Sequence, residues 1–127
     1  MKALLDTNVL TNLHFRPSRI GKQTRRSLES AKAIYFSPIT VFEWLQKDDY
    51  LGTNTAKLTR FSVEMGIQEL QLSAGAAMEA KRFGQLRGSD PLDFLILAQA
   101  AHAELDLFTS DSRLLDLGLL FIKDASL

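Results

Sequence analysis

Four acidic residues stand at positions where a carboxylate needs an explanation. Asp6 interrupts the apolar stretch MKALLDTNVL, Glu43 lies in ITVFEWL, Asp93 in DPLDF and Asp111 in TSDSR. Local structure can account for three of them, because Asp6, Asp93 and Asp111 could each border or cap the start of a helix. Glu43 comes six residues after Ser37, the expected start of its helix, so it is too far along to be a cap. Its apolar neighbours indicate that a cation lies nearby.

Brought together, these carboxylates would do a particular kind of chemistry. Crowded carboxylates repel one another and raise each other's pKa unless a divalent cation neutralises them. The chain has no cysteine, and His14 and His102 do not have metal-ligand spacing. Oxygen ligands of this kind favour Mg²⁺ or Mn²⁺ over zinc, and such ions activate water and stabilise the oxygens of a phosphodiester. The pattern therefore predicts metal-dependent hydrolysis of phosphodiester bonds.

The elements that must position these acids alternate along the chain. Short apolar segments predict strands at 2–5, 33–36, 67–72, 105–109 and 119–122. Between them, helix signals follow Asp6 and cover 18–32, 37–46, 54–65, 73–83 and 90–104, while 47–54 is predicted as a loop. Helices between consecutive strands favour a parallel sheet covered on both faces, the α/β class.

That architecture gives the positions of the acids a meaning. In an open parallel sheet, polar residues that follow the carboxyl ends of strands converge on a crevice. Asp6 follows the first predicted strand and Asp111 the fourth, while Glu43 and Asp93 lie near the starts of helices beside them. We therefore expect the four to face one another. Asp90 precedes Pro91 and is interpreted as the cap of its helix.

Composition and charge limit the remaining possibilities. The 127 residues, 46% of them hydrophobic, suit one domain over 1–127. No segment has the length of a signal-peptide core or a membrane span, so a cytoplasmic protein is expected. Net charge is zero, but residues 1–32 carry +5 and residues 33–127 carry −5. The basic segment is either a solvated helix face or a focused contact for an anionic partner.

Four motifs in order resemble those of one protein family. LLDTNVL, SPITVFEW, DPLDFLILAQA and FTSD are similar to the successive motifs of PIN-domain ribonucleases, particularly the VapC toxins of bacterial toxin–antitoxin pairs. The resemblance spans nearly the whole chain. It implies a single-domain, three-layer α/β/α sandwich with a five-stranded parallel sheet. It also implies endonucleolytic cleavage of RNA that depends on Mg²⁺ or Mn²⁺, inhibition by a small cognate antitoxin whose tail enters the active-site groove, and a homodimer.

The resemblance also assigns residues. The acidic centre of the family maps to Asp6, Glu43, Asp93 and Asp111, and its supporting polar positions map to Asn8 and Thr109. In this interpretation Asp6 and Asp93 bind the principal metal, Glu43 binds or orients its water, and Asp111 completes a second ion site. Five basic residues after the first helix are candidates to hold the RNA backbone: Arg16, Arg19, Lys22, Arg25 and Arg26.

Two alternative functions remain open on sequence alone. A phosphoacceptor domain of the receiver type is also doubly wound, and Thr109 and Lys123 would suit it. That fold needs an acid at the end of its third strand, where this chain has Ser73. A catalytically inactive PIN-like interaction module is the second alternative, and the retention of all four acids argues against it.

Overall fold

A single parallel sheet organises the protein. The computed structural model describes residues 1–51, 54–83 and 90–127. Its five strands all pair in parallel in the order β3-β2-β1-β4-β5, which confirms the α/β prediction. The strands are β1 (Lys2–Leu5), β2 (Ala33–Phe36), β3 (Gln68–Glu69), β4 (Asp106–Thr109) and β5 (Ile122–Asp124).

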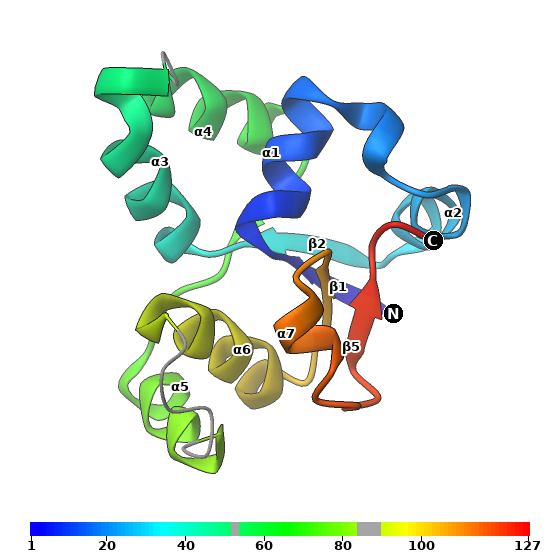
Figure 1. Ribbon diagram of the computed structural model, residues 1–127, viewed down its shortest axis with the longest axis vertical. Coiled ribbons are helices and arrows are strands. Elements are labelled where there is room, and N and C mark those ends of the chain that lie inside the picture. The colour runs from blue at the N-terminus through cyan, green and yellow to red at the C-terminus, as the bar shows by residue number, and fades with distance from the viewer. Residues whose placement is uncertain (52–53, 84–89) are drawn as a thin grey trace.

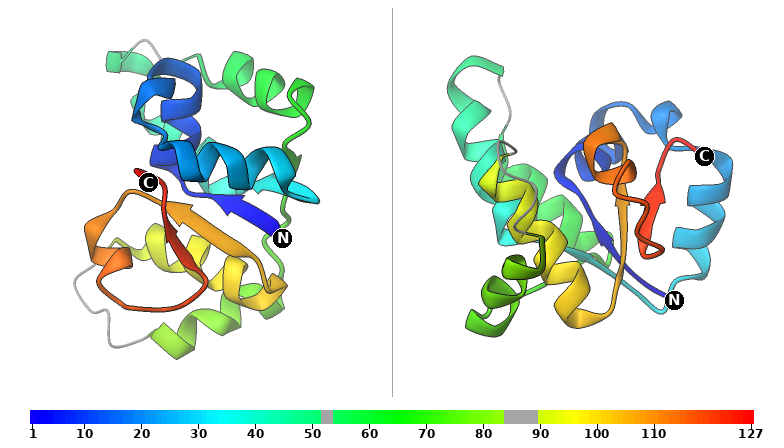
Figure 2. Two further views of the ribbon diagram at one scale, coloured as in Figure 1. Left: turned by 90° about the vertical axis from the view of Figure 1, so that its right-hand side faces the viewer. Right: turned by 60° about the horizontal axis from the view of Figure 1, so that its bottom comes forward.

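Helices cover both faces of this sheet (Figures 1 and 2). One face carries α1 (Thr7–Phe15), α2 (Lys22–Ser30) and the neighbouring α4 (Thr55–Glu64). The other carries α5 (Ala74–Glu79), α6 (Pro91–Ala103) and α7 (Ser112–Leu115). α3 (Pro38–Leu51) extends from the carboxyl edge beyond β2, and two short 3₁₀ turns are η1 (Pro17–Arg19) and η2 (Ala80–Phe83). The result is the three-layer arrangement that the sequence predicts.

The two layers of core follow from the alternation of side chains along the central strand. Ala3 and Leu5 of β1 belong to the core cluster beneath α1 and α2, whereas Leu4 belongs to the cluster beneath α6. All three are fully buried. A strand with apolar residues on both sides can be stable only when both faces of its sheet are covered. The run KALL therefore fits a central strand, and β1 indeed lies between β2 and β4.

Two predicted helix boundaries are wrong. The expected single helix over 18–32 is divided into η1 and α2, because Gly21 is extended and packs against the chain end. A Cβ at Gly21 would lie 2.0 Å from the carbonyl carbon of Leu127, and the Gly21 N–H donates to Ala125 O at 3.0 Å. The predicted loop 47–54 is also wrong over 47–51, where α3 continues. The first helix-breaking residue after Pro38 is Gly52, so nothing local stops the helix earlier.

Two predicted strands also differ from the structure. The segment 67–72 contributes only Gln68–Glu69, because Leu70 and Leu72 turn away to pack in the cluster beneath α6. The strand expected at 119–122 instead covers Ile122–Asp124. Leu120 is 91% exposed, and the register of β5 begins where Ile122 pairs with Leu107. Pairing partners, rather than local hydrophobicity, set both boundaries.

Strand order separates this fold from the receiver alternative. In the flavodoxin-like order of receiver domains, 2-1-3-4-5, the third strand lies between the first and the fourth. Here β1 pairs with β4 directly, and β3 is an edge strand next to β2. The receiver interpretation is therefore wrong at the level of topology. No helix in the described part of the chain combines the length and apolar character needed to cross a membrane.

Candidate active site

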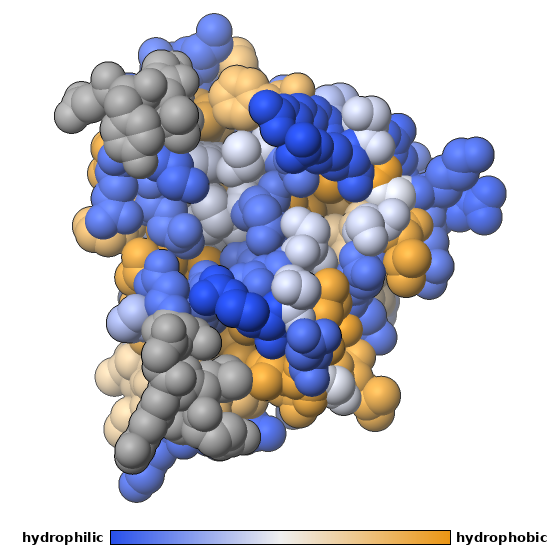
Figure 3. Space-filling view, in the orientation of Figure 1, coloured by the Kyte–Doolittle hydropathy of each residue, from blue (hydrophilic) through white to orange (hydrophobic). Residues whose placement is uncertain are grey.

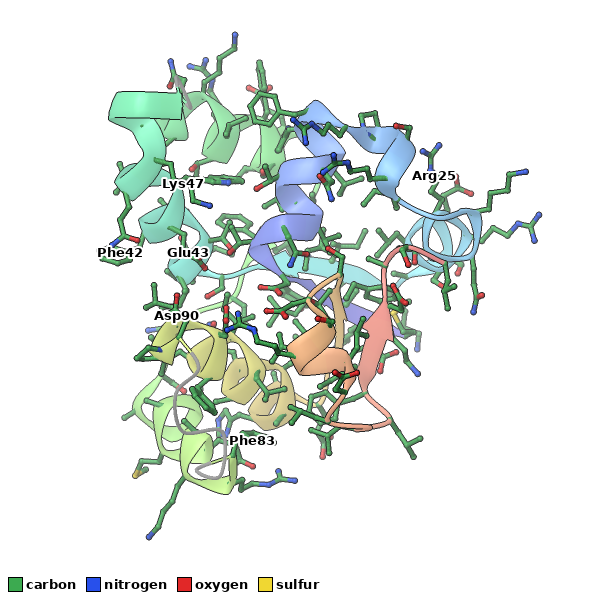
Figure 4. The ribbon with its side chains drawn as sticks, in the orientation of Figure 1. Arg25, Phe42, Glu43, Lys47, Phe83 and Asp90 are labelled. Atoms are coloured by element: carbon green, nitrogen blue, oxygen red, sulfur yellow. The ribbon has the colours of Figure 1, made fainter. Side chains whose placement is uncertain are left out.

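Four acidic residues from four different elements lie at the carboxyl edge of the sheet. Asp6 follows β1 and Asp111 follows β4, while α3 brings Glu43 and the start of α6 brings Asp93. In Figure 4, Glu43 and Asp90 lie across from each other on α3 and at the start of α6. Figure 3 shows hydrophilic residues gathered in the middle of the same face, between these two helices. The predicted convergence of the acids is therefore present.

Asp6 is the most enclosed member of this group. It is 3% exposed and caps α1 by accepting the Thr7 N–H at 2.9 Å. Its second oxygen accepts the Thr109 hydroxyl at 2.7 Å and the Asn8 amide at 3.3 Å. Burial raises the pKa of Asp6, and these hydrogen bonds offset part of that effect. The cap and site explanations of Asp6 are thus compatible, because its two oxygens are used differently.

Asn8 and Thr109 tie this carboxylate to the loop that carries Asp111. The Asn8 side-chain oxygen accepts the Ser110 N–H at 3.2 Å, and the Thr109 hydroxyl oxygen accepts the Asp111 N–H at 3.0 Å. Each side chain therefore contacts both Asp6 and the segment after β4. The structure places the two supporting residues where they can fix the distance between the first and the fourth acid.

Glu43 is held by hydroxyl groups rather than by apolar neighbours. The Thr7 hydroxyl donates to Glu43 Oε1 at 2.8 Å and lies 2.9 Å from the hydroxyl of Thr40. Because Thr7 uses its single proton on Glu43, it must accept from Thr40, so the two form a chain ending on the carboxylate. Phe42, an expected apolar neighbour, is 48% exposed and points away from the site (Figure 4). The predicted apolar surroundings of Glu43 are therefore wrong in part.

Asp93 and Asp111 share one cation. Arg113 Nη2 lies 3.1 Å from Asp93 Oδ2 and 3.0 Å from Asp111 Oδ2. Asp111 also caps α7 by accepting the Arg113 N–H at 2.9 Å. A capping box with Asp90 would require the Asp93 carboxylate to accept the Asp90 N–H. Among the described residues, this hydrogen bond does not occur. The contact of Asp93 is to Arg113 on a different helix.

The electrostatics of the site are those of excess negative charge. Burial raises the pKa of Asp93 to about 6, with repulsion from Asp6, Asp90, Asp111 and Glu43 adding to it. Burial also raises the pKa of Glu43, against the opposing effects of its Thr7 hydrogen bond and of Lys47 one helical turn away. Of the four acids, only Asp111 has a pKa below its usual value. Although burial acts to raise its pKa, the hydrogen bonds and charge of Arg113 outweigh it.

A buried polar contact aligns the helices that carry Glu43 and Asp93. Ser37 caps α3 by accepting the Ile39 N–H at 3.0 Å, and its hydroxyl donates to the side-chain oxygen of Gln99 on α6. The Gln99 amide donates in turn to Leu70 O at 3.0 Å. Gln99 is 1% exposed, so loss of these partners would leave a polar group buried without water. Gln99 thereby fixes the start of α3 against α6.

The donor set fits a hard divalent cation, although the side chains do not enclose one as they stand. Every candidate ligand is a carboxylate oxygen, as Mg²⁺ and Mn²⁺ prefer. Burial first, and then repulsion from the other carboxylates, raises the pKa of Asp93, and a bound cation would oppose both effects. Within residues 1–51, 54–83 and 90–127, however, no three Asp, Glu, His or Cys side chains are arranged to hold one metal ion. Arg113 and the hydroxyls of Thr7 and Thr109 occupy oxygens that a metal would need.

The predicted RNA-binding residues lie at a distance from the acids. They follow α1 and continue into α2. Figure 4 shows Arg25 at the right of the molecule, whereas Glu43 and Asp90 lie at the left. The Arg25 guanidinium donates to the carbonyl oxygens of Ile20 and Pro17 and so stabilises the turn before α2. All five residues are exposed, and Arg25 differs from Arg16, Arg19, Lys22 and Arg26 only in these hydrogen bonds. Their role in binding RNA stays a prediction.

Three functional side chains were not predicted from the sequence. Thr7 was interpreted only as part of a cap, and Thr40 and Arg113 were not considered. Thr40 lies three residues before Glu43, on the same helical face, and Arg113 lies two residues after Asp111. The expectation of a cation near the acids was the available signal, and the basic residue nearest to Asp111 in the chain would have met it.

Comparisons with known proteins agree with the fold and the motifs. No curated protein matches the sequence. A toxin–antitoxin complex from Klebsiella pneumoniae contains a chain that is 23% identical, with a TM-score of 0.69 and coverage of 97% of each chain. The structure of VapBC2 from Rickettsia felis bound to a DNA fragment from its promoter contains a chain that is 18% identical, with a TM-score of 0.69. The match covers 91% of the present chain and 92% of that chain. VapC20 from Mycobacterium tuberculosis, described as a sarcin-ricin loop cleaving toxin, is 10% identical, with a TM-score of 0.68 and coverage of 96% and 99%.

These similarities establish the fold, and the sequence establishes the family. The family model of the PIN domain matches residues 3–119. That range contains all four acids together with Asn8 and Thr109. The chain therefore belongs to the PIN domain family.

Proposed function

We propose that this chain is a divalent-metal-dependent endoribonuclease and the toxin of a toxin–antitoxin pair. The observation that carries the proposal is the convergence of Asp6, Glu43, Asp93 and Asp111 at one edge of the sheet, with the pKa of Asp93 raised to about 6. Among the described residues, Arg113 is the one cation in an ion pair with these four carboxylates. Such an excess of carboxylates over cations suits a site that recruits Mg²⁺ or Mn²⁺. The similar structures, which include a toxin–antitoxin complex and a sarcin-ricin loop cleaving toxin, support the same function.

Each residue has a role in this proposal. A divalent cation at this edge would lower the pKa of a water molecule and offset charge on the phosphate oxygens. Asp6 and Asp93 are the proposed principal ligands, since Asp6 is the carboxylate whose charge adds most to the raised pKa of Asp93. Glu43 orients the attacking water and accepts its proton, and the Thr40–Thr7 chain fixes the carboxylate for that purpose. Asp111 would help to hold a second ion, which would offset further charge on the phosphodiester.

Recognition of RNA is assigned to the exposed basic residues before and within α2. Lysine and arginine contacts to phosphates give affinity without sequence preference and make binding sensitive to salt. Arg25 is excluded from this proposal because carbonyl oxygens of the turn occupy its guanidinium. The others, Arg16, Arg19, Lys22 and Arg26, lie on the end of α1, η1 and α2, so an RNA that reaches the acids from there would cross the face over α1 (Figure 1).

The first experiment tests cleavage and its metal dependence together. Purified protein and its Asp93→Asn variant are incubated with total RNA and Mg²⁺ or Mn²⁺, and new RNA ends are mapped by sequencing. We expect discrete cleavage sites with the wild type, none with the variant, and none when EDTA exceeds the metal. Undiminished cleavage in EDTA would contradict the metal dependence. An absence of cleavage with both metals would contradict the nuclease.

A second experiment tests the toxin and its partner. Induced expression should arrest growth, and co-expression of a cognate antitoxin, sought as a small reading frame next to the gene, should restore it. Size-exclusion chromatography with light scattering of the co-expressed proteins then measures the complex and the proposed homodimer. The soluble amounts of the wild type and Asp93→Asn are compared as a control. Normal growth while the wild type accumulates in soluble form, at the level of the variant, would contradict the toxin assignment.

A further inference from the structure

Arg113 occupies a place in the acidic group that the proposed chemistry does not explain. Its side chain reaches from α7 to the first turn of α6, across 20 residues of sequence. Nη2 contacts one oxygen of Asp93 and one of Asp111, and Nε lies 3.3 Å from the other oxygen of Asp111. Its guanidinium thus joins the carboxylates from two separate elements at the same edge of the sheet.

The two carboxylates are much less accessible than the arginine that joins them. The side chains of Asp93 and Asp111 are 16% and 17% exposed, whereas that of Arg113 is 60% exposed. In the described part of the chain, the hydrogen bonds of its side chain go to these two carboxylates alone. The guanidinium can therefore leave toward solvent without abandoning any other contact, while the carboxylates stay in place.

Charge explains why an arginine lies there. Asp93 and Asp111 belong to a group that also includes Asp6, Glu43 and Asp90, and among the described residues Arg113 makes the only ion pairs to any of the five. A divalent cation would seek the same carboxylate oxygens. One oxygen cannot offer the same lone pair to a guanidinium N–H and to a metal ion, so occupancy by one weakens the other.

We propose that Arg113 is an internal counter-ion that holds Asp93 and Asp111 together in the metal-free protein and that a divalent cation must displace. This inference rests on the proposed metal-dependent function. Arg113 is a positioning residue: it keeps the two acids near their working separation and sets the metal concentration at which the site fills.

The test measures Mn²⁺ binding without RNA. Isothermal titration calorimetry compares the wild type with Arg113→Ala, in which the competitor is absent. The two ion pairs are exposed to solvent, so their loss changes the competition for the carboxylate oxygens only moderately. We therefore expect Arg113→Ala to bind Mn²⁺ about two- to thirtyfold more tightly than the wild type. Because Arg113 is exposed, the variant should fold normally, which circular dichroism checks.

Two further variants separate competition from a general effect of charge. Arg82→Ala removes an arginine of similar exposure, 62%, that pairs with Glu79 away from the acids, and it should leave Mn²⁺ affinity unchanged. Arg113→Lys keeps the positive charge but cannot bridge two carboxylates with a planar fork. Its affinity should move toward that of Arg113→Ala. If Arg113→Lys binds Mn²⁺ like the wild type, net charge alone acts and the proposed displacement is wrong.

The thermal unfolding of the metal-free proteins provides a second measure. Without its counter-ion, Arg113→Ala should unfold at a lower temperature than the wild type in EDTA, and saturating Mn²⁺ should remove most of the difference. Equal Mn²⁺ affinities of the wild type, Arg113→Ala and Arg82→Ala would overturn the inference while leaving a metal-binding nuclease intact. A wild type that neither binds Mn²⁺ nor cleaves RNA would overturn the proposed function as well.

Discussion

Replacing Asp93 by Asn removes one negative charge from the most crowded part of the site. Burial and the repulsion of four other carboxylates raise the pKa of Asp93 from 3.8 to about 6. A carboxyl whose pKa is higher in the folded than in the unfolded protein binds its proton more tightly when folded. Its contribution to stability is therefore fully present below about pH 4 and is lost as the pH rises through about 6.

The size of the effect follows from that rise. A shift from 3.8 to about 6 corresponds to about 3 kcal/mol of differential free energy at neutral pH. The side chain of Asp93 retains 16% exposure and contacts Arg113, so solvent and that cation reduce the penalty. We expect about 1–2 kcal/mol of the penalty to remain. Since asparagine cannot ionise, metal-free Asp93→Asn should be more stable than the wild type by this amount at pH 7.5, or about 3–8 °C in Tm.

The assay pairs stability with activity. Thermal unfolding in EDTA is followed by circular dichroism at pH 4.5 and pH 7.5, and cleavage of a fluorescent RNA is measured with Mn²⁺. The gain in Tm should be clearly smaller at pH 4.5 than at pH 7.5, because pH 4.5 lies between the unfolded pKa of 3.8 and the folded pKa of about 6, while cleavage is abolished at either pH. Asp116→Asn makes the same chemical change on an exposed residue and should alter neither quantity appreciably.

Three results would refute this reasoning. An active Asp93→Asn protein would show that the residue is not a ligand. A variant that is inactive because it has unfolded would mean that Asp93 stabilises the start of α6. A gain in Tm of equal size at both pH values, or of the size seen with Asp116→Asn, would show that the repulsion around Asp93 is not what limits stability.

Three other changes test separate parts of the structure. Asp90 accepts the Leu92 N–H at 2.9 Å as the cap of α6, so Asp90→Asn should keep stability and most activity, whereas Asp90→Ala should cost about 1 kcal/mol in thermal unfolding. Thr40→Val interrupts the hydroxyl chain to Glu43 and should lower kcat about tenfold without unfolding the protein, as loss of such supporting groups does elsewhere. Replacing Arg19, Lys22 and Arg26 together by glutamine should reduce the slope of log K against log salt concentration for RNA binding by about two units. Filter binding measures this slope, and an unchanged value would mean that these residues form a solvated surface and do not contact phosphates.

Much of the fold could be predicted because its signals are local. KALL and AIYF are short apolar runs, and both form the strands expected of them. The Ser37–Pro38 and Asp90–Pro91 pairs start α3 and α6 where expected, since a capping side chain and a proline at the first helical position act within a few residues.

The boundaries that failed depend on distant partners. Gly21 ends η1 and starts α2 because the carboxyl-terminal residues pack against it, more than 100 positions along the chain. β5 begins at Ile122 because Leu107 of β4 pairs with it there, although Leu119 and Leu120 are as apolar. Nothing within a short window of sequence can reveal either contact.

The groups available to the site could be identified from the sequence: four acids near a strand end or in the first turns of a helix, with Asn8 and Thr109 in support. The contacts that each group makes depend on the folded chain. The Thr7 hydroxyl reaches Glu43 across 36 positions, Thr109 reaches Asp6 across 103, and Arg113 reaches Asp93 across 20. Parallel strands bring their carboxyl ends to one edge whatever the lengths of the connections between them, so these contacts exist only once the sheet has formed.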